Sequence, residues 1–204
     1  MRKLYYISIV HNQADLGSMG SELSLEGEKK YGSELWKKHL IEVDKSWNKI
    51  ETKLLKIKKI DQIYQDGLPI VGEIGLKIIK DVAEKGSKNY QIIEKLIDKG
   101  AMLEQAESKE LLLKEYNLIL DITKAESKEE KLKTSILYQN ESLKLLNDRD
   151  EFIANQINTT LDGIGVAFFG AVHSIIDKLD KNIKIIEINF FNDEISLNLC
   201  YGKR

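Results

Sequence analysis

Cysteine, proline, arginine and histidine are all scarce in this chain. Its 204 residues include one cysteine, one proline and three histidines, and arginine occurs only at positions 2, 149 and 204. A single cysteine excludes an internal disulfide and a thiolate metal cluster, so a reducing, cytoplasmic compartment fits best. Cys200 has no basic neighbour before Lys203, which indicates an unreactive thiol.

The sequence also lacks a long apolar run and an excess of charge of one sign. The apolar stretch near the N-terminus covers about eight residues, too few for a signal peptide or for the ~18 residues that cross a bilayer. With 31 basic and 33 acidic residues the net charge is −2, which favours neither nucleic acid nor a membrane as a partner. Hydrophobic residues make up 42%, enough to build a core.

Segments typical of strands and of helices alternate along the chain. Ser127 opens one helical pattern as part of a Ser-Lys-Glu-Glu capping box, and Ser87 stands at the start of another. The segments 183–191 and 195–201 flank Asn-Asp and predict an antiparallel hairpin. We therefore predict an α/β fold with a mainly parallel central sheet flanked by helices and the hairpin at its edge. The predicted strands of the parallel part cover residues 3–10, 59–65, 101–105 and 164–169.

We expect a single α/β domain over residues 1–204, with a helical insertion at 108–148. Residues 12–32 are rich in glycine and polar side chains and predict a long loop. The helix expected over 33–59 carries a narrow apolar stripe from Trp36 to Ile57, with alternating spacings of four and three. This stripe either packs on the sheet or forms an interface between copies, so the pattern allows a homo-oligomer through this helix.

Ionisable side chains follow the predicted strands. His11 comes after the first strand, Asp66 after the second, Glu104 or Glu107 at the third, and His173 shortly after the fourth. Because ligands gather beyond the carboxyl ends of parallel strands, we expect these groups to share one edge of the sheet. Imidazoles and carboxylates together suit a divalent metal such as Mn, Co or Zn. The alternative is that both histidines only bind backbone groups.

Arg149 is the one internal arginine in a chain that otherwise takes its positive charge from lysine. A guanidinium holds a carboxylate or phosphate through two hydrogen bonds, which lysine does not reproduce. Arg149 is therefore a candidate to anchor an anionic substrate group or a developing oxyanion, and an ion pair with Asp150 at a helix start is the alternative. His39, on the helix beside Trp36, is expected to be structural or to lie at the solvent edge.

The stretch Arg149-Asp-Glu-Phe-Ile-Ala154, followed by an apolar strand and Gly170-Ala-Val-His173, resembles the C-terminal signature of the TraB, PrgY and Tiki proteins. In that family Arg-(Asp or Asn)-x-x-(Met or Ile)-Ala precedes a strand that ends in GxxH. The resemblance implies an α/β fold with its site at the strand ends, and hydrolytic chemistry. Tiki proteins are metal-dependent proteases, EreA-type proteins are esterases that use histidine without a metal, and ChaN-type proteins bind haem.

The wider EreA and ChaN-like superfamily has a histidine-bearing loop after the first strand, an acidic residue after the second, and a histidine after a late strand. His11, Asp66 and His173 stand in those places. Two positions depart from the pattern. Ser8-Ile-Val-His11 replaces Gly-Thr-x-His, and Asp66 stands where glutamate is common.

The sequence supports three functional hypotheses. The first is a hydrolase of peptides, esters or amides in which His11, His173 and an acid at position 66, 104 or 107 hold a divalent cation that activates water. The second uses His11 or His173 as a general base without metal. The third is a non-catalytic protein that binds or senses a small ligand, haem or a peptide. The chain has no GxSxG, P-loop, HExxH or GxGxxG motif, so the usual nucleotide-binding, serine hydrolase and zincin interpretations lose support.

Overall fold

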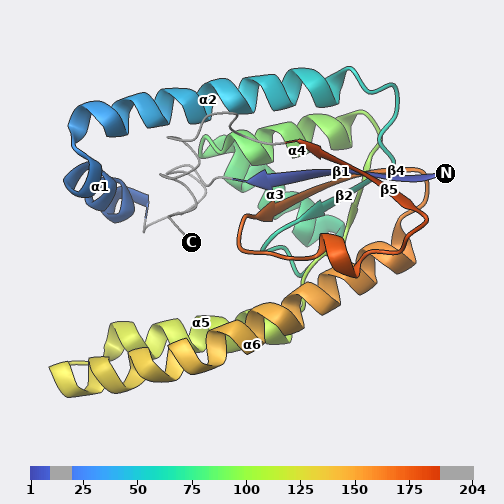
Figure 1. Ribbon diagram of the computed structural model, residues 1–204. Helices are drawn as coiled ribbons and strands as arrows, with labels where there is room; N and C mark the ends of the chain where they lie inside the picture. The colour runs from blue at the N-terminus through green and yellow to red at the C-terminus, as the bar shows by residue number, and fades with distance from the viewer. Residues whose placement is uncertain (10–19, 189–204) are drawn as a thin grey trace.

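The computed structural model describes residues 1–9 and 20–188. Its centre is a five-stranded sheet in the order β3-β2-β4-β1-β5, and every described pairing is parallel. The predicted α/β fold with a parallel sheet between helices is therefore confirmed (Figure 1). The strands are β1 (Arg2–Ile9), β2 (Gln62–Gln65), β3 (Met102–Glu104), β4 (Ile164–Gly170) and β5 (Ile183–Ile188).

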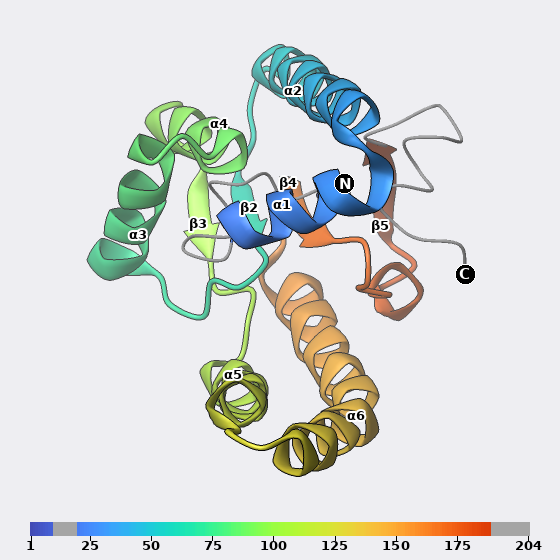
Figure 2. The ribbon, with the colours of Figure 1, turned by 90° about the vertical axis from the view of Figure 1, so that its left-hand side faces the viewer.

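Helices cover both faces of the sheet and give the molecule three layers (Figure 2). Because side chains alternate between faces along a strand, Ile7 of β1 packs with α2, α3 and α4, whereas Tyr6 packs with the end of α6. The helices are α1 (Gly20–Tyr31), α2 (Ser33–Leu55), α3 (Gly72–Glu84), α4 (Lys88–Asp98), α5 (Lys109–Lys124) and α6 (Lys128–Thr160), with a 3-10 turn, η2, at Ile176–Lys178.

Two helix starts are built as the sequence predicts. The Ser87 side chain accepts a hydrogen bond from the backbone of Tyr90 in the first turn of α4. Ser127 and Glu130 form a reciprocal capping box at the start of α6. In both cases a side-chain oxygen satisfies a backbone N–H that has no partner within the helix.

The antiparallel hairpin expected at the sheet edge is not found among the described residues. β5 pairs with β1 in parallel, because the chain crosses below the sheet through η2 before it enters β5. The Asn-Asp turn signal concerns only the residues beyond the end of β5 and does not report how β5 joins the sheet. The predicted returning strand, 195–201, and Cys200 lie outside the described residues.

The predicted loop over residues 12–32 is wrong in its second half, where α1 spans Gly20–Tyr31. One glycine that suggested a loop has a packing role, since a Cβ at Gly27 would lie 2.6 Å from the Trp36 ring. Gly27 thus allows α1 to lie directly on α2. The chain turns between the two helices at Gly32, whose φ of 82° favours glycine. Residues 12–19 lie outside the described part.

The apolar stripe of α2 packs against the sheet. Val43, Trp47, Ile50 and Leu54 are at most 4% exposed and belong to the core on this face. The stripe is therefore a core face at these four positions, which leaves them unavailable as a surface between copies. A homo-oligomer through residues 33–59 would have to use other side chains.

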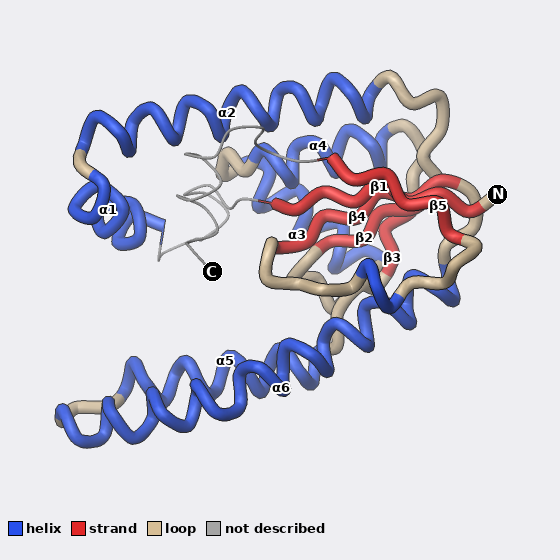
Figure 3. Tube along the Cα trace, viewed as in Figure 1, coloured by secondary structure: helices blue, strands red, loops and turns tan. Residues whose placement is uncertain are grey.

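α5 and the first part of α6 project from the body of the molecule as a pair of antiparallel helices (Figures 1 and 3). We call α5 together with residues 128–146 the arm. α6 is one helix of 33 residues that continues beyond the helical insertion predicted at 108–148. No residue of α5 is buried, and the buried residues of α6 begin at Leu145. None of the described helices combines the length and apolar character needed to cross a membrane.

Candidate functional site

The site begins at the tight turn that follows β4. The backbone N–H of His173 donates to the carbonyl of Gly170 at 3.0 Å, which folds the chain back over the C-terminal edge of the sheet. The imidazole packs edge-on against Phe169, with the ring centres 5.6 Å apart. As a result the His173 side chain is only 1% exposed although it follows a strand end.

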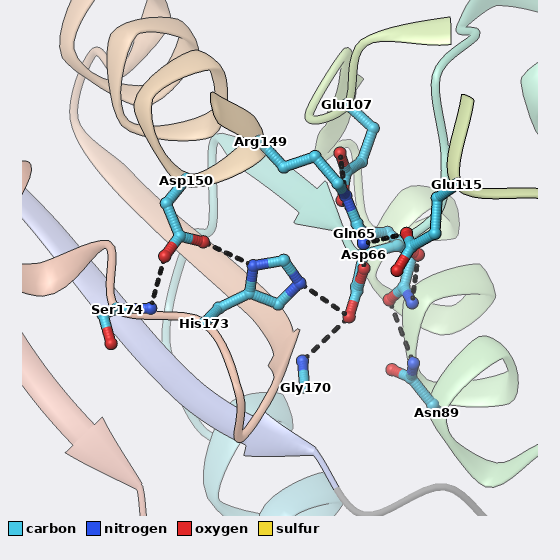
Figure 4. Close-up of polar contacts among 10 residues, drawn as sticks. All are labelled: Gln65, Asp66, Asn89, Glu107, Glu115, Arg149, Asp150, Gly170, His173 and Ser174. Carbon is cyan, nitrogen blue, oxygen red and sulfur yellow. Dashed lines mark hydrogen bonds and ion pairs between the residues drawn. The ribbon is translucent and has the colours of Figure 1, made fainter. Parts of the chain in front are cut away.

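His173 lies between two carboxylates (Figure 4). Its Nδ1 donates to Asp150 at 2.6 Å, and its Nε2 lies 3.4 Å from Asp66. The second oxygen of Asp150 accepts the backbone N–H of Ser174 at 2.9 Å. Because Asp150 accepts at both oxygens, it fixes the plane of the ring and leaves Nε2 directed at Asp66.

Asp66 joins the ends of β2 and β4 to α6. One carboxylate oxygen accepts the backbone N–H of Gly170 at 2.9 Å, and the other accepts Nη2 of Arg149 at 3.0 Å. The shorter aspartate side chain therefore reaches the site despite standing where glutamate is common in the family that the sequence resembles. Gln65 supports it from behind, since its amide donates to the Asp66 carbonyl at 3.1 Å and accepts from Asn89 at 3.0 Å.

Arg149 holds three carboxylates together. Its Nε and Nη2 donate to the two oxygens of Glu107 at 3.2 and 2.5 Å, and its Nη1 donates to Glu115 at 2.8 Å. With the bond to Asp66, these contacts use four of the five N–H donors of a guanidinium. The geometry therefore favours a role in positioning carboxylates over the expected role as an anchor for an anionic substrate.

In this site, burial and the neighbouring charged groups shift the pKa of each ionisable side chain in opposite directions. Burial lowers the pKa of His173, but Asp150 and Asp66 outweigh it and raise this pKa to about 9. Burial raises the pKa of Asp66, but His173, Gly170 and Arg149 bring it well below its usual value. Burial raises the pKa of Glu107, and Arg149 opposes this rise. Without another cation, His173 is therefore an imidazolium at neutral pH.

The structure brings three of the predicted ligands together. Ligand atoms of Asp66, Glu107 and His173 all lie within 4.8 Å of one another. Glu104 is not part of this group, because its side chain accepts from Gln62 at the start of β2 and so turns away from the edge that carries the site. Of the two predicted alternatives, Glu104 and Glu107, the structure therefore places only Glu107 beside Asp66 and His173.

Two other histidines complete the comparison with the sequence. His11, predicted as a ligand and catalytic residue, lies outside the described residues. His39 is buried in α2 with its ring 5.2 Å from that of Trp36, and it belongs to the helix layer rather than to the site.

Sequence reasoning missed two carboxylates. Asp150 was interpreted only as an ion-pair partner of Arg149, although the Arg-Asp pair itself marked the position. Glu115 carries no sequence signal, because it is one of several acidic residues on an exposed helix. It reaches the site only because α5 packs along α6.

No protein-family model matches the chain, and no significant match occurs among the curated proteins or the solved structures. The likeness to the TraB, PrgY and Tiki proteins thus depends on a few short segments of the sequence. Function has to be inferred from the chemistry of the site.

Proposed function

We propose that the protein is a hydrolase that depends on a divalent metal held by Asp66, Glu107 and His173. The observation that carries this proposal is the convergence of three ligand atoms within 4.8 Å at the C-terminal edge of a parallel sheet. Two carboxylates and one imidazole suit Mn, Co or Zn. Two ligand atoms that share a tetrahedral ion at about 2.1 Å lie about 3.4 Å apart, and Nε2 of His173 lies 3.4 Å from Asp66.

Asp150 supports the same interpretation. A histidine that binds a metal through one ring nitrogen usually donates its other N–H to a carboxylate or carbonyl, which fixes the tautomer and the ring orientation. The contact between His173 Nδ1 and Asp150 has this form, and the backbone of Ser174 holds the carboxylate in turn.

The charge balance also favours a cation. Four carboxylates, on Asp66, Glu107, Glu115 and Asp150, meet only two cationic side chains, on Arg149 and His173. A divalent ion would replace the proton on Nε2 of His173, because a ligand imidazole must be neutral there. The net charge of these groups would then change from −2 to −1, because the ion adds two positive charges and His173 loses one.

A bound metal would supply a water molecule with a lowered pKa, which is the nucleophile that hydrolysis needs. The chain's own residues have separate tasks. Arg149 orients Asp66 and Glu107, and Asp150 keeps the Nδ1 proton on His173. The resemblance to Tiki and EreA-type proteins favours a peptide, ester or amide substrate. We also propose a cytoplasmic location, and we expect no nucleic acid or membrane partner, because of the single cysteine and the balanced charge.

The experiment compares Glu107→Gln with Glu104→Gln, two acids of one chain segment of which only the first faces the site. Calorimetric titration with Mn²⁺, Co²⁺ and Zn²⁺ should give one ion per chain for the wild type and for Glu104→Gln. Glu107→Gln and His173→Ala should weaken binding at least tenfold. Wild-type protein that binds none of these ions, or equal affinities for the two glutamine variants, would refute the metal site.

Hydrolysis is tested separately with panels of chromogenic esters, amides and peptides. Turnover that a chelator abolishes and added metal restores supports the proposal. Turnover that survives the chelator but is lost in His173→Ala would instead support the second candidate, a metal-free mechanism in which His173, held by Asp150, is the base. Such turnover should rise as the pH approaches the His173 pKa of about 9, because the base must be neutral. Ligand-induced stabilisation without turnover would indicate a binding or sensing protein, for haem or for another small ligand.

A further inference from the structure

The arm exposes large apolar side chains that the body of the molecule does not cover. Five of them, between 48% and 76% exposed, are Leu113, Tyr116, Leu132, Ile136 and Leu143. Such side chains on a long projecting hairpin differ from scattered surface leucines, because they are concentrated on one element.

These residues are spaced as in a coiled-coil seam. On α5 the spacing from Leu113 to Tyr116 to Leu120 is three and then four. On α6 it is four from Leu132 to Ile136 and seven from Ile136 to Leu143, with Gln139 at the intervening position. Repeats of three and four place side chains on a single stripe that a partner helix can cover.

Both stripes lie on the same side of the hairpin. Residues 113 and 116 on α5 and residues 136, 139 and 143 on α6 each follow a less exposed residue by one position. One residue turns a helix by about 100°. Because α5 and α6 run antiparallel, equal rotations away from their contact bring both stripes to one face. We call this face, formed by Leu113, Tyr116, Leu120, Leu132, Ile136 and Leu143, the arm face.

The charge of the arm narrows the choice of partner. α5 carries three lysines and three acids, and residues 128–146 of α6 carry four lysines and three acids. The arm is therefore close to neutral, with both signs interspersed. Such a surface gives neither a basic stripe for nucleic acid or anionic lipid nor a field that selects a charged protein, whereas two copies of it meet without net repulsion.

The size of the arm face is sufficient for a specific contact. α5 has 16 residues, which makes it about 24 Å long, and two adjacent helices are about 20 Å wide. The face thus measures about 500 Å² per copy and about 1,000 Å² for a pair, which reaches the lower bound for a specific interface.

We propose that two copies of the chain associate through their arm faces and form a four-helix bundle. A lone helical hairpin in water gains little from intrinsic propensity, and most helices are stabilised by packing of an apolar face. The bundle gives both helices that packing. The interface lies on the arm, whereas the sequence had suggested residues 33–59, and it does not depend on the proposed hydrolase activity.

The test uses sedimentation equilibrium between 1 and 200 µM with a control on the same helix. The wild type should sediment at about 47 kDa, twice the 23.4 kDa of one chain. Ile136→Glu and Leu143→Glu should weaken association at least a hundredfold. Leu137→Glu is the control, because Leu137 is 47% exposed but lies about 100° around the helix from Ile136, and it should leave the dimer intact.

A variant that should strengthen association shows whether the effect of the glutamate variants comes from the interface or from misfolding. Gln139→Leu completes the apolar seam on α6 and should tighten association about tenfold. Circular dichroism should show unchanged helix content in all variants. A wild type that is monomeric at 200 µM, or equal effects of Ile136→Glu and Leu137→Glu, would overturn the proposal. So would a monomer whose arm face binds anionic vesicles.

Discussion

α6 is one continuous helix, but its first part is exposed to solvent and its last part is buried against the sheet. Residues 128–146 lie in the arm, where large apolar side chains are exposed, and the last turns lie under the sheet with Ile153 and Ile157 fully buried. Arg149 and Asp150 stand at the boundary between the two. The comparison shows that helix formation alone does not reveal burial, because the same continuous helix has no buried residue before Leu145 and several after it.

The largest expected difference between the two ends concerns Arg149. Arg149→Ala would leave Glu107 and Asp66 buried without their cation, and breaking a buried pair in this way costs about 3–5 kcal/mol. Lys144→Ala, on the exposed part of the same helix, should change the free energy of unfolding by less than about 0.5 kcal/mol. Urea unfolding of both variants measures the difference, and similar losses would contradict the contrast between the two ends.

The next largest effect is a pH dependence of the free energy of unfolding, which arises at His173 beside the buried part of α6. The folded pKa of His173 is about 9, above the unfolded value of about 6.5. Its contribution is therefore fully present below pH 6.5 and is lost as the pH rises through 9. The metal-free protein should lose up to about 3 kcal/mol of unfolding free energy across this window.

His173→Gln removes the titrating group and is the control for this pH dependence. The difference in unfolding free energy between wild type and variant should shrink from pH 6.5 to pH 9. A constant difference would mean that the imidazole is already neutral in the folded protein at pH 6.5.

A smaller effect is expected at the tip of the arm. Ser127→Ala removes one half of the capping box at the start of α6 and should cost about 1 kcal/mol. Hydrogen exchange should show faster opening of the first turns of α6, with no change in the turns that carry Ile153 and Ile157. Uniform loss of protection along the helix would instead show that the arm and the body unfold as one unit.

The comparison can also be made between two leucines of α6 that lie within three residues of each other. Leu143 is 76% exposed and Leu145 is buried. At concentrations at which the protein is monomeric, Leu143→Ala should change stability by less than about 0.5 kcal/mol, and Leu145→Ala should cost about 2 kcal/mol. Thermal unfolding at low and high protein concentration would separate this monomer effect from any contribution of association.

Much of the sheet could be predicted because the central strands β1 and β4 are largely apolar on both faces and the strands end at clear turns. The same rule placed Asp66 and His173 at one edge, since parallel strands bring their carboxyl ends together. The choice between Glu104 and Glu107 could not be made, because it depends on where the chain turns after the short strand β3. The parallel pairing of β5 was missed because a turn signal beyond a strand does not report how that strand joins the sheet.

Helices were harder to delimit than strands. The helical insertion was expected to end at residue 148, but α6 continues to Thr160, and the Asn147 side chain donates to Glu151 one turn later. α1 was missed because Gly27 looked like a loop residue, although it allows close packing on Trp36. Glu115 could not be assigned to the site from any local pattern, since its role depends on the pairing of two helices.

The bond between Glu115 and Arg149 has a mechanical consequence. Glu115 belongs to α5, which has no buried residue, yet it holds the Nη1 end of the guanidinium whose other end orients Asp66 and Glu107. Lifting α5 away from α6 would pull on that guanidinium or release it. A movement of the arm would then change the position of Arg149 and, through it, the charge environment of Asp66 and Glu107 at the sheet edge.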